Sequence, residues 1–170
     1  MVFVSTNAAP EVWLRGPIPG VAPLLMPAAH ALLQAREDIE RVAAAVGLDE
    51  LWHRPGGAAS AGFHLQHVAG SLDRLLTYAR GERLSEEQRR ALAQEGTSGA
   101  PASDLVIAAC AAIDRGLEQL RQTPPDSLLE PRAVGRRQLP TTVLGLVFHA
   151  AEHTTRHVGQ LITTLKVVDL

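Results

Sequence analysis

The chain has 170 residues, a length that favours one domain with a core of its own. Hydrophobic residues make up 46% of the chain but aromatic residues only 4%, so alanine, leucine and valine must fill the interior. This composition suits close-packed helices better than a sheet, which is usually rich in β-branched and aromatic residues. The formal net charge of −2 gives no reason to expect nucleic acid or an anionic membrane as a partner, so we expect neither.

Cys110 is the single cysteine, which excludes an intrachain disulfide and makes the reducing cytoplasm the expected location. The first residues lack the basic and apolar regions of a signal peptide, so we expect no leader. No run approaches the roughly 18 uninterrupted apolar residues that a membrane-spanning helix needs.

Residues 1–22 are rich in proline and glycine and are predicted to form an irregular N-terminal arm that packs through Trp13 and Leu14. Pro23 is suited to a helix start. Apolar residues then recur every three or four positions, which predicts an amphipathic helix that ends near Gly47.

A second helix is predicted from an N-cap at Ser60 to about Arg80. The residues that begin at Ser85 resemble a capping box, which opens a short polar helix to about Glu95. A flexible crossover follows and leads to the third long helix.

The third long helix is predicted from residues 103–104 to the proline pair at 124–125. Residues 126–139 are expected to be irregular, and residues 140–142 to open a last helix that runs almost to the C-terminus. Four long amphipathic helices predict an all-α four-helix bundle, formed by a single domain over residues 1–170.

Five of the seven histidines fall in two of these helices: His64 and His67 in the second, and His149, His153 and His157 in the last. Imidazoles four positions apart on a helix are offset by about 40° around the axis and about 6 Å along it, so both can reach one metal ion. A third imidazole from a neighbouring helix would complete a three-histidine site. Its remaining positions would stay open to water or substrate, as in catalytic sites.

Periodicity alone leaves the ligand set open. His157 lies on the apolar seam of the last helix and His153 at its edge, but His149 and His153 have the same spacing. In the second helix, His64 lies closer to the apolar stripe than His67 does. The alternative to a metal site is a set of core histidines that hydrogen-bond to other groups, although burying several imidazoles without a shared partner is unfavourable.

Two segments carry a family resemblance. Residues 60–69, SAGFHLQHVA, place a serine seven residues before a histidine that is followed by an apolar residue and alanine. Residues 153–160, HTTRHVGQ, have the form H-x-x-x-H-x-G-Q. In this order, and in a chain with four helical patterns, they resemble the DinB/YfiT-like superfamily of metal-dependent enzymes.

The resemblance implies that the family's metal ligands fall on His67, His153 and His157, and that His64 occupies a variable position. It also implies a bundle with a long crossover between the second and third long helices, often dimeric, that binds zinc or nickel. The family pattern does not need His149, which is expected either to line the pocket or to lie on the surface.

A metal-ligating imidazole normally donates its other N–H to a neighbouring group. Gln160, three residues after His157, is a candidate for that role, although it can equally face solvent. His64 and His149 are further candidates for the pocket or for the support of the ligands.

No carboxylate stands at an offset that would make it an obvious general base. Glu152 is adjacent to His153, so it points about 100° away from that histidine. Asp73 and Arg74, six and seven residues after His67, are interpreted as a local surface charge pair.

The resemblance therefore implies a metal-dependent hydrolase, or a transferase or isomerase that uses a low-molecular-weight thiol, acting on a small molecule. The expected cofactor is one divalent ion, with zinc the first candidate and nickel the second, and the expected assembly is a homodimer. The alternative is a non-enzymatic metal-binding or stress-related bundle, which a fourth protein ligand would favour.

Overall fold

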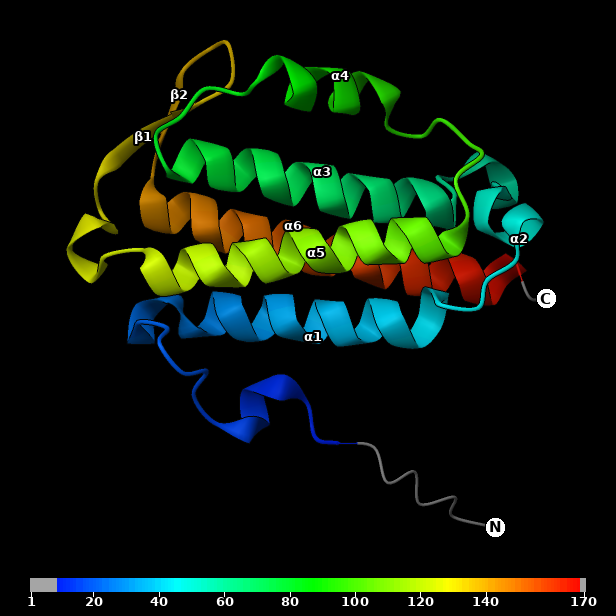
Figure 1. The fold of residues 1–170 in the computed structure, drawn as a ribbon, viewed down its shortest axis with the longest axis horizontal. Helices are drawn as coiled ribbons and strands as arrows, with labels where there is room; N and C mark the ends of the chain where they lie inside the picture. The colour runs from blue at the N-terminus through cyan, green and yellow to red at the C-terminus, as the bar shows by residue number, and fades with distance from the viewer. Residues whose placement is uncertain (1–8, 169–170) are drawn as a thin grey trace.

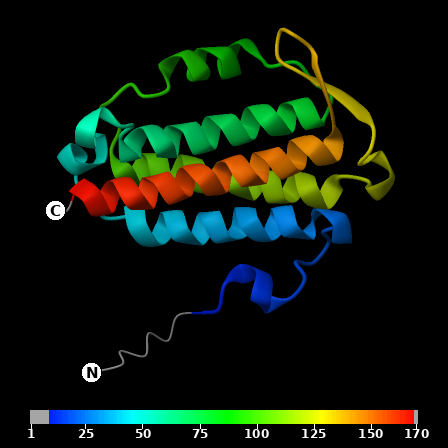
Figure 2. The same ribbon diagram turned by 180° about the vertical axis from the view of Figure 1, so that it is seen from behind.

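The computed structural model describes residues 9–168, and four long helices dominate it (Figure 1). They are α1 (Met26–Ala43), α3 (Ala61–Ala79), α5 (Ala102–Gln122) and α6 (Val143–Val168). Both α1 and α3 pack on α5 and on α6, so α1 lies diagonally across the bundle from α3. Figures 1 and 2 show α5 on one face of the molecule and α6 on the opposite face. The predicted four-helix bundle is confirmed.

The directions of the four long helices require a long connection between α3 and α5. The colours of Figure 1 show that α1 and α6 run in one direction and that α3 and α5 run in the other. Because α3 and α5 are parallel neighbours, the chain must return along the whole bundle between them. It does so through residues 80–101, which carry the short helix α4 (Glu86–Gln94). This segment is the predicted crossover.

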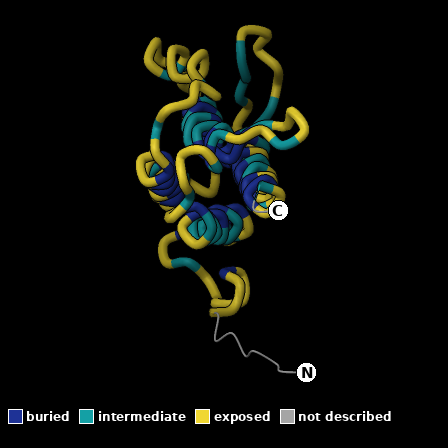
Figure 3. The backbone as a smooth tube through the Cα atoms, turned by 90° about the vertical axis from the view of Figure 1, so that its right-hand side faces the viewer, coloured by how far each residue is buried: buried dark blue, intermediate teal, exposed yellow. Residues whose placement is uncertain are grey.

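The core consists of aliphatic residues from all four long helices and the segments beside them. In Figure 3 the buried residues lie on the inward sides of the helices, whereas the crossover, the hairpin and the N-terminal arm are mostly exposed. The largest buried aliphatic side chains are Leu25, Leu32, Ile39, Leu51, Leu65, Leu72, Ile113, Leu120 and Leu161. Within residues 9–168, no helix combines the length and the apolar character needed to cross a membrane.

Side-chain caps begin two of the helices where the sequence predicts them. Ser60 Oγ accepts the backbone N–H of Phe63 at 3.1 Å and so caps α3. Ser85 and Gln88 form a reciprocal capping box at the start of α4. These bonds satisfy N–H groups that have no partner inside the helix.

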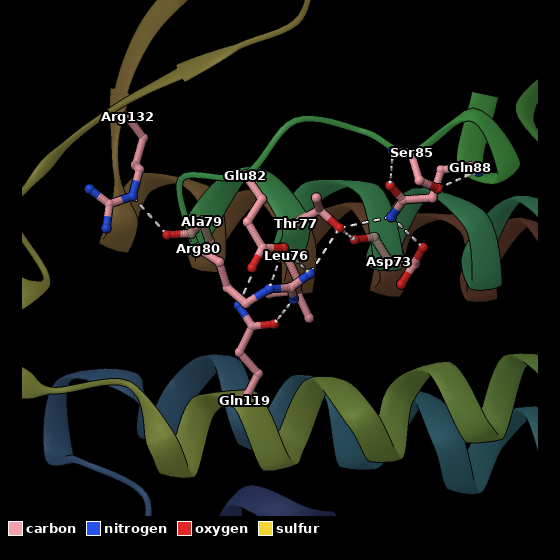
Figure 4. A network of polar contacts seen from close by, with 10 residues as sticks. All are labelled: Asp73, Leu76, Thr77, Ala79, Arg80, Glu82, Ser85, Gln88, Gln119 and Arg132. Carbon is pink, nitrogen blue, oxygen red and sulfur yellow. Dashed lines mark hydrogen bonds and ion pairs between the residues drawn. The ribbon is translucent and has the colours of Figure 1, made fainter.

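Polar side chains hold α4 against α3, because no residue of α4 is buried (Figure 4). The side-chain nitrogen of Gln88 donates to Asp73 Oδ2 at 2.6 Å and to Thr77 Oγ1 at 2.8 Å. The side-chain oxygen of the same residue accepts the N–H of Ser85. The capping residue therefore both starts the short helix and attaches it to the bundle.

The segment between α5 and α6 differs from the prediction of irregular chain over residues 126–139. It forms an antiparallel hairpin of β1 (Pro131–Val134) and β2 (Leu139–Thr142), with Pro131 opposite Thr142. Each strand has only four residues, which is too short for a period of two to be recognised. Because β2 includes residues 140–142, α6 begins at Val143 and not at the proline.

The hairpin is anchored to the bundle from both sides. Arg132 Nε donates to the carbonyl of Ala79, at the end of α3, at 2.8 Å (Figure 4). Thr142 Oγ1 accepts the N–H of Gly145 at 3.0 Å and so supports the start of α6. The hairpin is therefore attached at the end of the bundle where α3 ends and α6 begins.

The N-terminal arm packs through a different residue from those predicted. Residues 1–8 of the predicted arm lie outside the described residues. Trp13 and Leu14 are 62% and 58% exposed, whereas Val12 is only 2% exposed. The arm forms a 3-10 turn at this point, which directs Val12 to α1, where its N–H donates to Gln34 Oε1 at 3.0 Å.

Short helical segments complete the fold within residues 9–168. The sequence did not predict α2 (Leu48–Trp52), because five residues are too few for a helical period. The remaining elements are 3-10 helices: η1 (Val12–Arg15), η2 (Pro23–Leu25), η3 (Pro55–Gly57) and η4 (Pro125–Ser127).

Trp52 fixes α2 on the first turn of α3. Its indole N–H donates to the carbonyl of Ala100, just before α5, at 3.0 Å. Its ring lies so close to Gly62 that a Cβ at that position would be 2.8 Å from the ring carbons. Gly62 therefore allows the indole to pack directly on the helix backbone.

Two glycine-to-alanine substitutions should have opposite effects on stability. Gly159→Ala in α6, where an added Cβ meets nothing, should stabilise the fold by about 0.5–1 kcal/mol through helix propensity. Gly62→Ala gains the same propensity but forces the Trp52 ring to move, and should destabilise the fold by about 1 kcal/mol net. Urea denaturation measures both, and equal stabilisation of the two variants would contradict the close approach of Trp52.

Candidate metal centre

Three histidines from two neighbouring helices meet at one side of the bundle. His67 comes from α3, and His153 and His157 come from adjacent turns of α6. Each offers one ring nitrogen, and these three nitrogens all lie within 4.8 Å of one another. The histidines are thus positioned to bind a metal ion, and they are the three on which the family's ligands were expected to fall.

The contact between His67 and His153 shows how the rings face one another. Their Nε2 atoms are 2.9 Å apart. Two such nitrogens approach closely only when a proton or a cation lies between them, because their lone pairs otherwise repel. Tetrahedral zinc with bonds of 2.0–2.1 Å holds its nitrogen ligands about 3.3 Å apart. The rings therefore need only a small adjustment to share an ion.

Burial keeps two of the three imidazoles in the form that binds metal. Desolvation, followed by the neighbouring His67 and His153, lowers the pKa of His157 to about 4. Burial, with His67 as the next cause, also lowers the pKa of His153 below its ordinary value. Both rings are therefore neutral at neutral pH, and a neutral imidazole is the species that coordinates a metal.

His64 and Phe63 support the cluster from the first turn of α3. His64 is buried, and its Nδ1 lies 3.1 Å from Nδ1 of His157, so one of the two nitrogens donates to the other. Burial lowers the pKa of His64 as well. The ring of Phe63 stacks on His67, with centroids 5.3 Å apart and an interplanar angle of 13°. His64 is thus a neighbour of the three clustered histidines and not a member of the group.

Gln160 and His149 lie outside the group of three, although the ring centroid of His149 is 5.4 Å from that of His153. Gln160 is exposed and makes no hydrogen bond to a histidine among the described residues. The side chain of His149 is 51% exposed, with Nδ1 at 3.4 Å from Glu152 Oε2. Glu152 also binds Arg156 on the outer face of α6. Of the two positions considered for His149, the structure therefore favours the surface.

The sequence reasoning missed an acidic residue in contact with the cluster. Glu95, at the end of α4, lies with Oε2 2.7 Å from His67 Nδ1 and with Oε1 2.6 Å from Arg74 Nη1. Arg74 is buried, so the interpretation of Asp73 and Arg74 as a surface charge pair is wrong. Arg74 lies seven residues after His67, which places both on one face of α3, and this spacing is the signal that could have pointed to a shared partner.

The carboxylate of Glu95 is held in its ionised form. Burial by itself would raise the pKa of Glu95, but hydrogen bonds from His67 and Arg74 outweigh that effect and lower this pKa below its ordinary value. The side chains of Glu95 and Arg74 are each only 10% exposed. The site therefore contains a buried carboxylate. One of its oxygens pairs with Arg74, and the other contacts His67.

Two cavities within residues 9–168 are lined by elements that also carry the cluster. A groove of about 570 Å³ runs between the arm, α1 and the outer face of α6, and is lined by Trp13 and Ile162. A second cavity of about 480 Å³ lies between the crossover, α3 and α5, and includes Glu95 in its wall. None of the three clustered histidines lines either cavity. They are themselves only partly buried, so the cluster is accessible from solvent.

Comparison with known proteins agrees with this geometry. A family model described as the DinB superfamily matches residues 31–161, which is well over half of the chain. The matched region begins in α1, ends in α6 and contains all three clustered histidines. A search of curated proteins found no match. The chain belongs to the DinB superfamily.

Proposed function

We propose that this protein is a metal-dependent enzyme in which His67, His153 and His157 bind one divalent ion, with zinc the first candidate and nickel the second. One observation carries the proposal. The three nitrogens converge within 4.8 Å, and within residues 9–168 no fourth histidine, cysteine or carboxylate joins the group. Three protein ligands with an open position are characteristic of catalytic zinc sites, whereas structural sites are closed by four.

Two reaction classes fit an open three-histidine site: hydrolysis of a small molecule, and transfer or isomerisation that uses a low-molecular-weight thiol. An ion bound there would lower the pKa of a coordinated water or thiol and polarise a substrate carbonyl. The carboxylates nearby are engaged elsewhere, because Glu95 binds His67 and Arg74, and Glu152 binds Arg156. The chain's own contribution is therefore to hold His153 and His157 neutral and to orient the three ligands.

Single substitutions of the ligands test the proposed site. His67→Ala, His153→Ala and His157→Ala should each weaken zinc binding by more than about 100-fold, beyond the 10–100-fold typical of residues that only support a ligand. The measurements are metal content after dialysis and the Kd from competition with a chromophoric chelator. His53→Ala, at an exposed histidine, is the control and should retain about one equivalent.

Two results of that experiment would contradict the proposal. Full zinc occupancy in the His67→Ala protein would exclude the ligand assignment. Absence of zinc binding by the folded wild-type protein would favour the alternative of a bundle with no metal-dependent activity. His149→Ala should also retain about one equivalent, because His149 lies outside the group of three even though its ring is close to His153.

Cobalt substitution distinguishes the two reaction classes. If the open position accepts a thiol, adding glutathione or cysteine to the cobalt-loaded protein should produce a thiolate-to-cobalt charge-transfer band in the near ultraviolet. A spectrum that stays unchanged at millimolar thiol would favour hydrolysis with bound water. The His157→Ala protein, treated with cobalt in the same way, should bind little of the ion and so controls for thiol binding by free cobalt.

The proposal also includes the homodimer that the family resemblance implies. Trp13, Leu24 and Phe148 are large apolar side chains that stay more than half exposed in the single chain, which supports a further apolar contact. Light scattering after size-exclusion chromatography should therefore give about twice the mass of one chain. A monomer at micromolar concentration would contradict this part of the proposal.

A further inference from the structure

We propose that Glu95 is a positioning residue that fixes the tautomer of His67, so that the crossover between α3 and α5 sets the metal affinity of the cluster. This inference rests on the proposed metal-binding function. A neutral imidazole carries one proton, and the hydrogen bond made by one nitrogen determines which nitrogen carries it. Glu95 Oε2 lies 2.7 Å from His67 Nδ1 and can only accept, which places the proton on Nδ1 and leaves the lone pair on Nε2.

The Nε2 lone pair of His67, which this arrangement leaves free, faces the cluster. Nε2 of His67 is the atom 2.9 Å from Nε2 of His153. In the other tautomer, the proton would occupy this position and would have to be lost or moved before a cation could bind. The carboxylate therefore prepares His67 as a ligand before any ion arrives.

Arg74 determines which way the carboxylate can turn. Its Nη1 lies 2.6 Å from Glu95 Oε1, so each oxygen of Glu95 has its own partner. Gly70 lies one turn before Arg74 on α3 and makes room for this pair. A Cβ on Gly70 would lie 2.5 Å from Glu95 Oε1 and 2.6 Å from Arg74 Nη1. Substitution of this glycine would thus displace the carboxylate without changing any charge.

The backbone after Glu95 is held by the same face of α3. The side-chain oxygen of Gln66 accepts the N–H of Gly96 at 2.7 Å, and its nitrogen donates to the carbonyl of Thr97 at 3.2 Å. Gly96 has a φ of +87°, a conformation that favours glycine, and a Cβ there would lie 3.3 Å from the Phe63 ring. The end of the crossover therefore has a defined position relative to the helix that carries His67.

The three clustered histidines differ in the hydrogen-bond partner of Nδ1. His157 contacts the neutral imidazole of His64 through Nδ1, and Nδ1 of His153 is buried with no hydrogen-bond partner among the described residues. Only His67 of the three has a charged acceptor in the described structure. Removal of this acceptor should thus affect His67 selectively, which makes the inference testable at a single residue.

Glu95→Gln is the sharpest test, because Arg74 then dictates the orientation of the amide. Arg74 can only donate, so the amide oxygen turns toward it and the NH2 group turns toward His67 Nδ1. His67 must then accept at Nδ1 and carry its proton on Nε2. We expect zinc affinity to fall 10–100-fold, measured by chelator competition.

The double variant Arg74→Met/Glu95→Gln should reverse this effect. Without the arginine, the amide oxygen can turn back to His67 Nδ1, so zinc affinity should recover to within about threefold of wild type. Glu152→Gln is the matched control, since it removes one negative charge next to His153 in the sequence but lies on the outer face of α6. It should change affinity by less than about threefold.

Long-range ¹H–¹⁵N NMR of the metal-free proteins reads the tautomer directly, without any activity. Wild type and the double variant should show His67 protonated at Nδ1, and Glu95→Gln should show it protonated at Nε2. An unchanged tautomer in Glu95→Gln would overturn the inference, as would an equal loss of affinity in Glu95→Gln and Glu152→Gln. If wild type shows the Nδ1 tautomer but binds no zinc, the proposed function fails while the role of Glu95 at His67 stands.

Gly70→Ala provides a second route if Glu95→Gln does not fold. It should displace the carboxylate and weaken zinc binding about 10-fold, with all ligands and charges retained. Gly159→Ala, the open glycine of α6, is its control and should bind zinc like wild type. Wild-type affinity in a folded Gly70→Ala protein would count against a defined position of the carboxylate.

Discussion

The packing of α3 against α6 determines where every other part of the site lies. These helices are antiparallel neighbours, and small or aliphatic buried residues such as Val68, Ala150 and Leu161 lie along them. At the edge of this apolar contact, the histidines are partly withdrawn from water. Partial burial keeps His153 and His157 neutral, while the exposed part of each ring leaves the cluster open to solvent. The packing that stabilises the bundle thus also creates donors for a metal.

The parallel arrangement of α3 and α5 gives the crossover a second role. A shorter connection would join antiparallel helices, but this chain must return along the bundle before α5 can begin. The returning segment passes over the face of α3 that carries His67 and delivers Glu95 to it. Topology and chemistry are thereby linked, because the same connection that completes the bundle supplies the acidic neighbour of the cluster.

Much of the fold follows from local patterns in the sequence. The long helices have clear apolar periods, and the caps at Ser60 and Ser85 are short-range signals that the structure reproduces. The paired spacing on α6 likewise indicated a possible site. It did not select His67 over His64, because His64 lies closer to the apolar stripe of its helix, and only the family resemblance pointed to His67.

The rest depends on contacts between distant parts of the chain. Glu95 lies 28 residues from His67, and no period connects a crossover to a helix. The strands of the hairpin and α2 are too short for a hydrophobic period to be recognised. The direction of a single 3-10 turn buries Val12 and leaves Trp13 exposed. Sequence patterns thus identified which side chains could bind a metal, whereas tertiary packing decided which groups surround them.

The attachment of α4 by polar contacts alone has a consequence for dynamics. A segment without buried side chains can detach and reattach while the four long helices stay folded, since such openings require far less free energy than global unfolding. Its amide hydrogens should exchange with solvent through these local excursions. Each excursion that reaches Glu95 would release His67 from its acceptor, so the lifetime of the attached crossover sets how long the cluster stays prepared for an ion.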